Sequence, residues 1–157
     1  MSIKNLKPNN PKYHQGYYDL INEEKYVGPH PIIFRSGLER KYCMYCDRNT
    51  DIVNWSSEPI KIRYFYPVDK KMHNYYVDFY VKARQSDGTF KEFLVEVKPE
   101  RETRKPLPPK KKSKKAYKNY QYAVKTYIKN YYKAKYAKKY AEERGMKYII
   151  LTEKSIK

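Results

Sequence analysis

Cysteines, glycines and long apolar runs are all scarce in this chain of 157 residues. Its only cysteines, Cys43 and Cys46, exclude a framework of several disulfide bonds. No apolar run approaches the length that spans a membrane, and the first residues lack the apolar segment of a signal peptide. We therefore expect an intracellular protein with no membrane anchor, long enough to form one domain with a hydrophobic core.

Acidic residues are few as well: 17 Asp or Glu stand against 35 Lys or Arg, a formal net charge of +18. Such an excess indicates a polyanionic partner, and nucleic acid fits it better than a membrane surface does. A second explanation stands beside this one. The 20 tyrosines and the many lysines could reflect the codon usage of an AT-rich genome.

Composition divides the chain into an arm and one domain. Residues 1–28 are polar and are expected to form a loosely ordered N-terminal arm, with at most one helical turn around residues 17–25. The prolines of residues 29–31 mark the start of a single domain, residues 29–157. Inside it, residues 101–115 are rich in Pro and Lys and are predicted to be an exposed basic linker.

The first helix of the domain is predicted from Ser36 to Arg48. Ser36 and Glu39 form a capping-box pattern at its start. Helical spacing predicts an inward stripe of Leu38, Glu39, Tyr42, Cys43 and Cys46. The residues expected to face water are Arg40, Lys41, Asp47 and Arg48. Glu39 can serve as a cap alone, but its place on the inward stripe leaves a functional role equally open.

The next segments are predicted to form three strands. The first covers 52–55 and 59–66 and is bent or interrupted near 56–57; the others cover 75–84 and 90–99, with a connector over 67–74. Two of these strands carry charge inside an apolar run. Asp78 lies in the second, and Glu96 and Lys98 lie in the third, where a period of two places both on one face. Charged groups are costly to bury unless they are paired or hold a metal. These three residues therefore call for a functional explanation.

The turn between the last two strands decides how the acids meet. A three-residue loop over 86–88, with Gly88 left-handed, places Asp78 directly opposite Glu96. A two-residue Asp87–Gly88 loop would instead send the two carboxylates to opposite faces. We predict the three-residue loop. Opposed carboxylates repel each other unless a cation lies between them.

The C-terminal third is strongly basic, since residues 101–144 hold 16 Lys or Arg and 3 Glu, a net of +13. Two helices are predicted, over 114–128 and 131–144, because Asn130 can cap the second; one unbroken helix is the alternative. Gly145 then ends the helix, and a last strand is predicted over 146–152. Interleaved tyrosines suit contact with phosphates and sugars, although core packing explains most of them equally well.

Paired carboxylates beside a lysine suit phosphodiester cleavage. That reaction needs a divalent cation to offset phosphate charge and to activate water. Magnesium takes oxygen ligands and keeps several waters, so two carboxylates and a substrate oxygen suffice. The lysine can then orient the water and stabilise the developing negative charge.

Two other signals are weaker. Cys43 and Cys46 have the spacing of a zinc or redox pair, but His14, His30 and His73 are scattered and supply no second paired motif. Buried thiols on an inward helix face are the better interpretation. Trp55 is expected to be a core anchor at the strand bend.

The ordered pattern resembles the PD-(D/E)XK nuclease superfamily. Within it, the chain is similar to the branch of TnsA-type transposase endonucleases and to the head completion nucleases of T-even-type contractile-tailed phages. The matching stretches are Phe34–Glu39, Ile52–Glu58, Tyr76–Asp78, Phe93–Thr103 and Arg144–Glu153. One departure is Val77, which stands where the superfamily usually has a Pro before the strand acid.

The resemblance implies an α/β (α+β) fold: a restriction-endonuclease-like core in the order α-β-β-β-α-β, with a mixed sheet flanked by helices, a basic helical insertion and the N-terminal arm. Position by position it implies the catalytic residues Glu39, Asp78, Glu96 and Lys98. The implied metal ligands are Asp78, Glu96 and the backbone carbonyl of Val97, for Mg²⁺ with Mn²⁺ as a substitute. Candidate DNA contacts on the second helix are Lys115, Lys118, Gln121 and Lys125.

The function implied is a magnesium-dependent endonuclease, with exonuclease activity as an addition, acting on packaged phage DNA before heads are joined to tails. Its partners would be double-stranded DNA and portal or neck proteins, and it would act in the host cytoplasm or remain in the virion. One alternative is a DNA-binding structural protein of the phage neck with little or no catalysis. Another is an RNA- or ribosome-associated basic protein, which leaves Glu96 and Lys98 unexplained.

Overall fold

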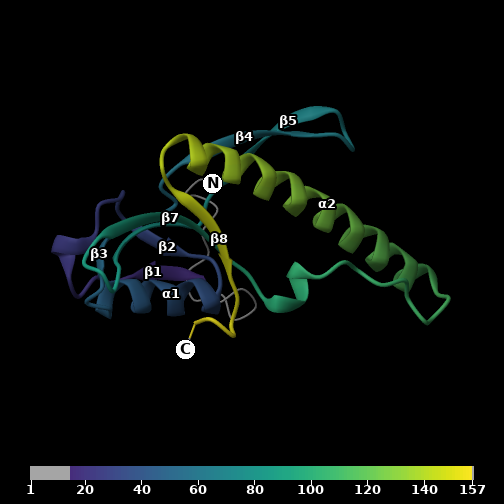
Figure 1. Cartoon of the computed structure of the whole chain (residues 1–157). Helices are drawn as coiled ribbons and strands as arrows, with labels where there is room; N and C mark the ends of the chain where they lie inside the picture. The colour runs from purple at the N-terminus through teal and green to yellow at the C-terminus, as the bar shows by residue number, and fades with distance from the viewer. Residues whose placement is uncertain (1–14, 157) are drawn as a thin grey trace.

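The computed structural model describes residues 15–156 (Figure 1). Its core consists, in chain order, of α1 (Gly37–Arg48), β3 (Ile52–Ser57), β6 (Phe79–Arg84), β7 (Phe90–Val97), α2 (Lys114–Glu143) and β8 (Lys147–Leu151). The strands form one mixed sheet in the order β3-β6-β7-β8, antiparallel except that β8 runs parallel to β7. The predicted α+β fold and its α-β-β-β-α-β order are confirmed.

The two helices cover opposite faces of this sheet (Figure 1). On one face, Tyr42, Cys43 and Cys46 of α1 pack with apolar residues of β6 and β7. On the other, Ala137 and Ala141 of α2 pack with apolar residues of β7 and β8. Burial raises the pKa of both thiols, which are free and buried as predicted. The alternation of residues along β7 therefore sends Leu94 and Glu96 toward the α2 side.

The loop between β6 and β7 has the predicted length. The Gln85 N–H donates to the Thr89 carbonyl at 2.7 Å, and Gly88 has a φ of 85°. Phe79 pairs with Val95 across the hairpin. This register leads to Asp78 facing Glu96 one step further along, as the three-residue loop predicts.

Of the two alternatives for residues 52–66, the interrupted strand is correct, and the break falls at residues 58–60. Glu58 has a φ of 46°, a left-handed conformation that turns the chain out of the main sheet. The segment after it forms a separate two-stranded ribbon, β4 (Lys61–Tyr66) and β5 (Lys71–Tyr76), which runs along α2 (Figure 1). The predicted connector over 67–74 is therefore partly strand, and the predicted strand over 75–84 is shared between β5 and β6.

The prediction of two C-terminal helices is wrong, because α2 is one helix of 30 residues. Asn130 lies inside it and caps nothing. Ser113 is the N-cap, accepting the Ala116 N–H at 3.1 Å. The preceding linker is mostly exposed, as predicted, with one short 3-10 turn, η3 (Glu100–Thr103). No helix of the described residues is both long and apolar enough to cross a membrane.

Residues 15–28 are packed against the domain, in contrast to the loosely ordered arm that was predicted; the rest of that arm lies outside the described residues. They form β1 (Gly16–Tyr18), which pairs with β2 (Ile32–Phe34), and the 3-10 turn η2 (Glu23–Lys25). Tyr26 lies edge-on to Trp55, with ring centroids 4.8 Å apart. Trp55 is fully buried, at 0% exposed, as expected of a core anchor.

Asp47 fixes this segment to α1, so the prediction that Asp47 faces water is wrong. Its buried carboxylate accepts the Tyr18 hydroxyl at 2.8 Å and the N–H groups of Ile21 and Asn22 at 2.8 and 2.9 Å. The Lys25 ammonium donates to the carbonyls of Cys46, Asp47 and Asn49, at the C-terminal end of α1. These contacts satisfy carbonyls that the end of a helix leaves without partners.

We expect Asp47→Asn to lower the free energy of unfolding at pH 7 by about 2–4 kcal/mol, because it weakens charge-assisted hydrogen bonds in a buried site. Burial alone raises the pKa of Asp47, but these donors and Lys25 bring it below its usual value. The Asp47 carboxylate therefore contributes to stability above its pKa in the unfolded chain, which is about 4. This contribution is lost as the pH falls through the lower pKa of Asp47 in the folded protein. Urea unfolding of both proteins between pH 3 and pH 7 measures it. The exposed Asp51→Asn is the control and should change stability by less than about 0.5 kcal/mol.

Candidate active site

Asp78 and Glu96 lie together at one end of the β6–β7 hairpin. Asp78 comes just before β6, and Glu96 is the second-last residue of β7. The Asp78 carboxylate (Oδ2) accepts the N–H of Val97 at 2.8 Å, so its side chain reaches across to the strand that carries Glu96. The structure therefore brings together the two acids that the hairpin register predicts to meet.

The charge of this pair is energetically costly. Burial raises the pKa of Asp78 well above its usual range, and the carboxylates of Glu96 and Glu39 raise it further. The Val97 N–H opposes them only in part. A divalent cation between the carboxylates would relieve this repulsion.

Two tyrosines hold Glu96 in place, and the sequence did not single out either of them. The Tyr75 hydroxyl at the end of β5 donates to Oε2 of Glu96. The Tyr148 hydroxyl of β8 lies 3.0 Å from that of Tyr75. One oxygen of Glu96 is thus occupied by a hydroxyl, and the position of the carboxylate is set by two strands besides its own.

Glu39 lies at the start of α1, on the rim of this group. Its N–H donates to Oγ of Ser36 at 3.1 Å, and its own Oε2 accepts the Arg35 N–H at 3.0 Å. Burial, then the charges of Glu96 and Glu58, raise the pKa of Glu39 to about 7 against the Arg35 N–H. Glu39 therefore takes part in the hydrogen bonds at the start of α1, and the charge of Glu96 also acts on it. The capping role and the functional role both stay open.

Glu58 is a fourth carboxylate near the group, which spacing alone did not reveal. Its N–H donates to the Asp78 carbonyl at 2.8 Å, and its Oε1 accepts Nε of Arg35 at 3.1 Å. Glu58, in its left-handed conformation, thus links the end of β3 to the backbone of Asp78. It supports the backbone of Asp78 directly.

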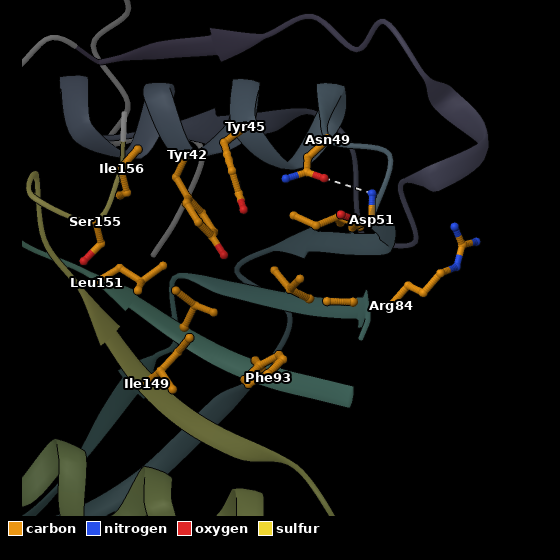
Figure 2. Close-up of a pocket in the computed structure, with 14 residues that line it drawn as sticks. Tyr42, Tyr45, Asn49, Asp51, Arg84, Phe93, Ile149, Leu151, Ser155 and Ile156 are labelled. Carbon is orange, nitrogen blue, oxygen red and sulfur yellow. Dashed lines mark hydrogen bonds between the residues drawn. The ribbon is translucent and has the colours of Figure 1, made fainter. Parts of the chain in front are cut away.

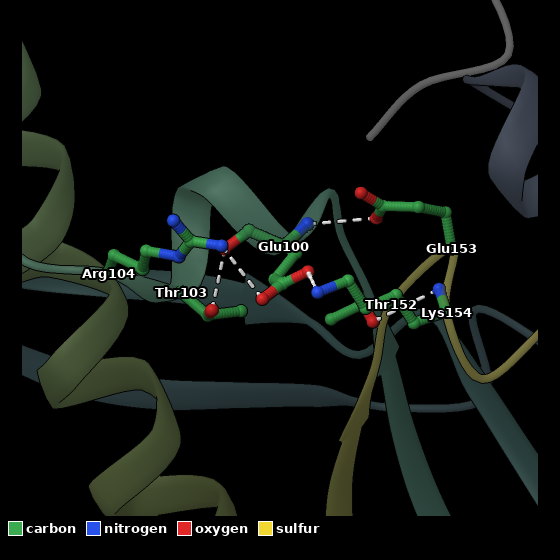
Figure 3. Close-up of polar contacts among 6 residues, drawn as sticks. All are labelled: Glu100, Thr103, Arg104, Thr152, Glu153 and Lys154. Atoms are coloured by element: carbon green, nitrogen blue, oxygen red, sulfur yellow. Dashed lines mark hydrogen bonds and ion pairs between the residues drawn. The ribbon is translucent and has the colours of Figure 1, made fainter.

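Lys98 follows β7 and is 9% exposed. Its N–H donates to the Leu151 carbonyl at 3.0 Å, which continues the pairing of β7 with β8. Just beyond it, Glu100 binds Arg104 at 2.8 Å and Lys154 at 2.5 Å (Figure 3). The Lys154 pair joins the start of the basic linker to the C-terminal segment, and the Arg104 pair lies within the linker, so the backbone just after Lys98 is held in place.

The candidate DNA-contact residues lie away from the acids. All four are exposed residues of the N-terminal half of α2 and form no contact with the acids: Lys115, Lys118, Gln121 and Lys125. Their position fits a solvated basic surface that a phosphate backbone could lie along.

The donor set fits magnesium better than zinc. Between residues 15 and 156, no three Cys, His, Asp or Glu side chains are grouped as metal ligands. Asp78 and Glu96 are a pair of carboxylates, and magnesium is commonly held by one or two carboxylates together with substrate oxygens and waters. A closed zinc site around Cys43 and Cys46 would need two further ligands.

An apolar pocket of about 380 Å³ lies on the other face of the sheet, between α1 and the strands (Figure 2). Tyr42 and Tyr45 of α1 and Ile149 and Leu151 of β8 are among the side chains that line it. None of the predicted site residues does. Its lining is largely apolar, with Asp51 and Arg84 as its charged residues.

A mixed sheet between two helices, with an acid before the second core strand and Glu-x-Lys on the third, defines a restriction-endonuclease-like nuclease domain. The chain belongs to the TnsA-like endonuclease family, whose N-terminal domain model matches residues 49–153. It is similar to the head completion nuclease of Enterobacteria phage T4, with 35% identity over 137 residues, which cover 87% of this chain and 89% of that protein. These findings support a nuclease role.

Proposed function

We propose that the chain is a magnesium-dependent deoxyribonuclease that hydrolyses phosphodiester bonds inside double-stranded DNA. The observation that carries the proposal is the meeting of Asp78 and Glu96 beside Lys98, on a fold of the TnsA-like endonuclease family. The net charge of +18 adds general affinity for a polyanion.

The proposed roles of these residues differ according to their chemistry. Asp78 and Glu96 would hold Mg²⁺, or Mn²⁺ in its place, with the carbonyl of Val97 as a further ligand. Bound there, the ion supplies charge to the phosphate and lowers the pKa of the attacking water. Lys98 orients this water and stabilises the charge that develops on the phosphate oxygens. The attacking water loses a proton to solvent as its oxygen bonds to phosphorus, the phosphorus–oxygen bond to one nucleoside breaks, and the departing oxygen takes up a proton from solvent.

The setting proposed for this activity is phage head completion. The support is the similarity to the T4 head completion nuclease over most of both chains. We propose that the protein acts on packaged DNA before head-tail joining, in the host cytoplasm, with portal or neck proteins as partners and with exonuclease activity as an addition. A structural neck protein that binds DNA without cutting it is the second candidate; the strong positive charge is what favours it.

The direct test is nicking of supercoiled plasmid by the purified protein. With magnesium we expect conversion to open circles, and with EDTA no conversion, because the acids alone do not activate water. DNA binding without cutting, under both magnesium and manganese, would favour the structural role. The readout is gel electrophoresis over time at several metal concentrations.

A further inference from the structure

The Lys133 side chain of α2 lies against Tyr75, one of the two tyrosines that hold Glu96 in place. Its ammonium lies 5.3 Å from the centre of the Tyr75 ring, and the hydroxyl of that same tyrosine donates to Glu96. The side chain is half-buried. Burial lowers the pKa of Lys133; the charge of Glu96 opposes this, and the charge of Lys98 lowers the pKa further. Lys133 is therefore within electrostatic reach of Glu96 and Lys98, two of the proposed catalytic residues.

Lys98 approaches α2 from the side of the sheet. A small cavity of about 130 Å³ is lined by Lys98 together with Ala134, the helix residue next to Lys133. In the part of the chain that the structure describes, neither the Lys98 nor the Lys133 ammonium forms an ion pair or a side-chain hydrogen bond. The Lys133 ammonium forms a cation–π contact with the ring of Tyr75.

The ammonium groups of Lys98 and Lys133 are near enough to repel each other, since the charge of Lys98 lowers the pKa of Lys133, and no ion pair among the described residues neutralises either one. Charges removed from water are normally compensated by a partner of opposite sign. Glu96 and Asp78 are near, but the proposed function engages them with a cation of their own. The anion that both lysines suit is then a phosphate of the substrate.

We propose that Lys98 and Lys133 bind the scissile phosphate from two sides, so that Lys133 is a further catalytic residue supplied by α2. This rests on the proposed nuclease function. Lys133 keeps its proton throughout, and its charge stabilises the extra negative charge that the phosphate oxygens gain as water adds to phosphorus. The contact with Tyr75 holds the ammonium in place, because a cation over the face of an aromatic ring is attracted to it.

The test compares steady-state plasmid cleavage by Lys133→Met, Lys133→Arg and the wild type. Loss of the charge should lower kcat about 100-fold, comparable to removing one transition-state donor, while Lys133→Arg should stay within about tenfold because arginine also binds phosphate. Lys129→Met is the matched control. Its ammonium lies 5.4 Å over the ring of Tyr66, one helical turn earlier, and we expect its kcat to stay within about threefold of the wild type.

Affinity for a short duplex in EDTA gives a second readout, independent of turnover. Lys133→Met should reduce the slope of log affinity against log salt by about 1, as loss of one phosphate contact does. If Lys133 merely supported Tyr75, the methionine chain would keep that packing, and neither kcat nor the salt slope would change. Thermal melts verify folding, and Lys133→Gln supplies the same charge loss if the methionine variant does not fold.

The outcomes separate the two proposals. If Lys98→Ala is inactive while folded Lys133→Met cuts within threefold of the wild type, the phosphate role of Lys133 is wrong and the nuclease function stands. If the wild type cuts no DNA with magnesium or manganese, both are overturned. A large loss in Lys133→Met that Lys133→Arg restores, with Lys129→Met active, supports the inference.

Discussion

Glu96→Ala and Lys98→Ala should each reduce plasmid nicking at least about 1,000-fold. In the proposed mechanism Glu96 is one of the two carboxylates that would hold Mg²⁺, and its loss would remove one ligand and one negative charge that fix the ion beside the attacking water. In the proposed mechanism Lys98 would stabilise the charge that develops on the phosphate oxygens, and its side chain is largely buried, where such charge has its greatest effect. The measurement is the initial rate of open-circle formation under saturating magnesium.

Glu92→Ala is the matched control for Glu96→Ala. Glu92 lies on the same strand and the same face, and its Oε2 also accepts a tyrosine hydroxyl, that of Tyr80. It is further from Asp78, so its loss should leave the nicking rate within about threefold, whereas a merely structural role for strand acids would affect both variants alike. Lys147→Ala, an exposed residue of β8, serves the same purpose for Lys98. Equal cutting by wild type, Glu96→Ala and Lys98→Ala would remove the assignment.

The meeting of the acids was predictable because it depends on local chemistry. Asp87 and Gly88 mark the turn and leave two common loop lengths, and the length, once chosen, sets which residues oppose each other. The alternation along β7 then places Glu96 and Lys98 on one face. Nothing distant in the chain can alter these two facts once the hairpin forms.

The partners of those acids were not predictable, because they arrive from elements that pack only in three dimensions. Tyr148 is one of many tyrosines, and Lys133 is one of several lysines along α2. What distinguishes them is the side of the helix or strand that docks on the sheet. Glu58 was missed for another reason: its left-handed turn is made by a residue other than glycine, so no turn residue at position 58 marks the exit from the main sheet.

The segment 15–28 shows the same limit in the fold itself. Polar composition predicted a loose arm, but the polar groups find their partners on α1. Asp47 and Lys25 are far apart in sequence and are joined through buried hydrogen bonds and helix-end carbonyls. Helical spacing alone assigned Asp47 to solvent, because it carries no information on what covers the helix.

Removing residues 15–28 should therefore abolish stable folding, the largest stability effect we expect. The loss exposes Trp55, which Tyr18 and Tyr26 now cover, and leaves the buried Asp47 without its donors. An uncompensated buried charge alone costs about 3–5 kcal/mol, and each uncovered aromatic adds about 1.5–3 kcal/mol. These terms together reach the whole stability of a typical domain, about 5–15 kcal/mol.

The comparison that isolates this segment is between chains that begin at residue 15 and at residue 29. Both lack the same residues before 15, so any difference in melting temperature or in near-UV circular dichroism belongs to residues 15–28. We expect a cooperative melt for the longer chain and none for the shorter. A shorter chain that melts cooperatively within a few degrees of the longer one would show that the domain begins at residue 29 and that Asp47 tolerates burial without these donors. Adding Asp47→Asn to the shorter chain refines the test: removing the stranded charge should recover part of the lost stability, because a neutral amide costs less to bury than a carboxylate.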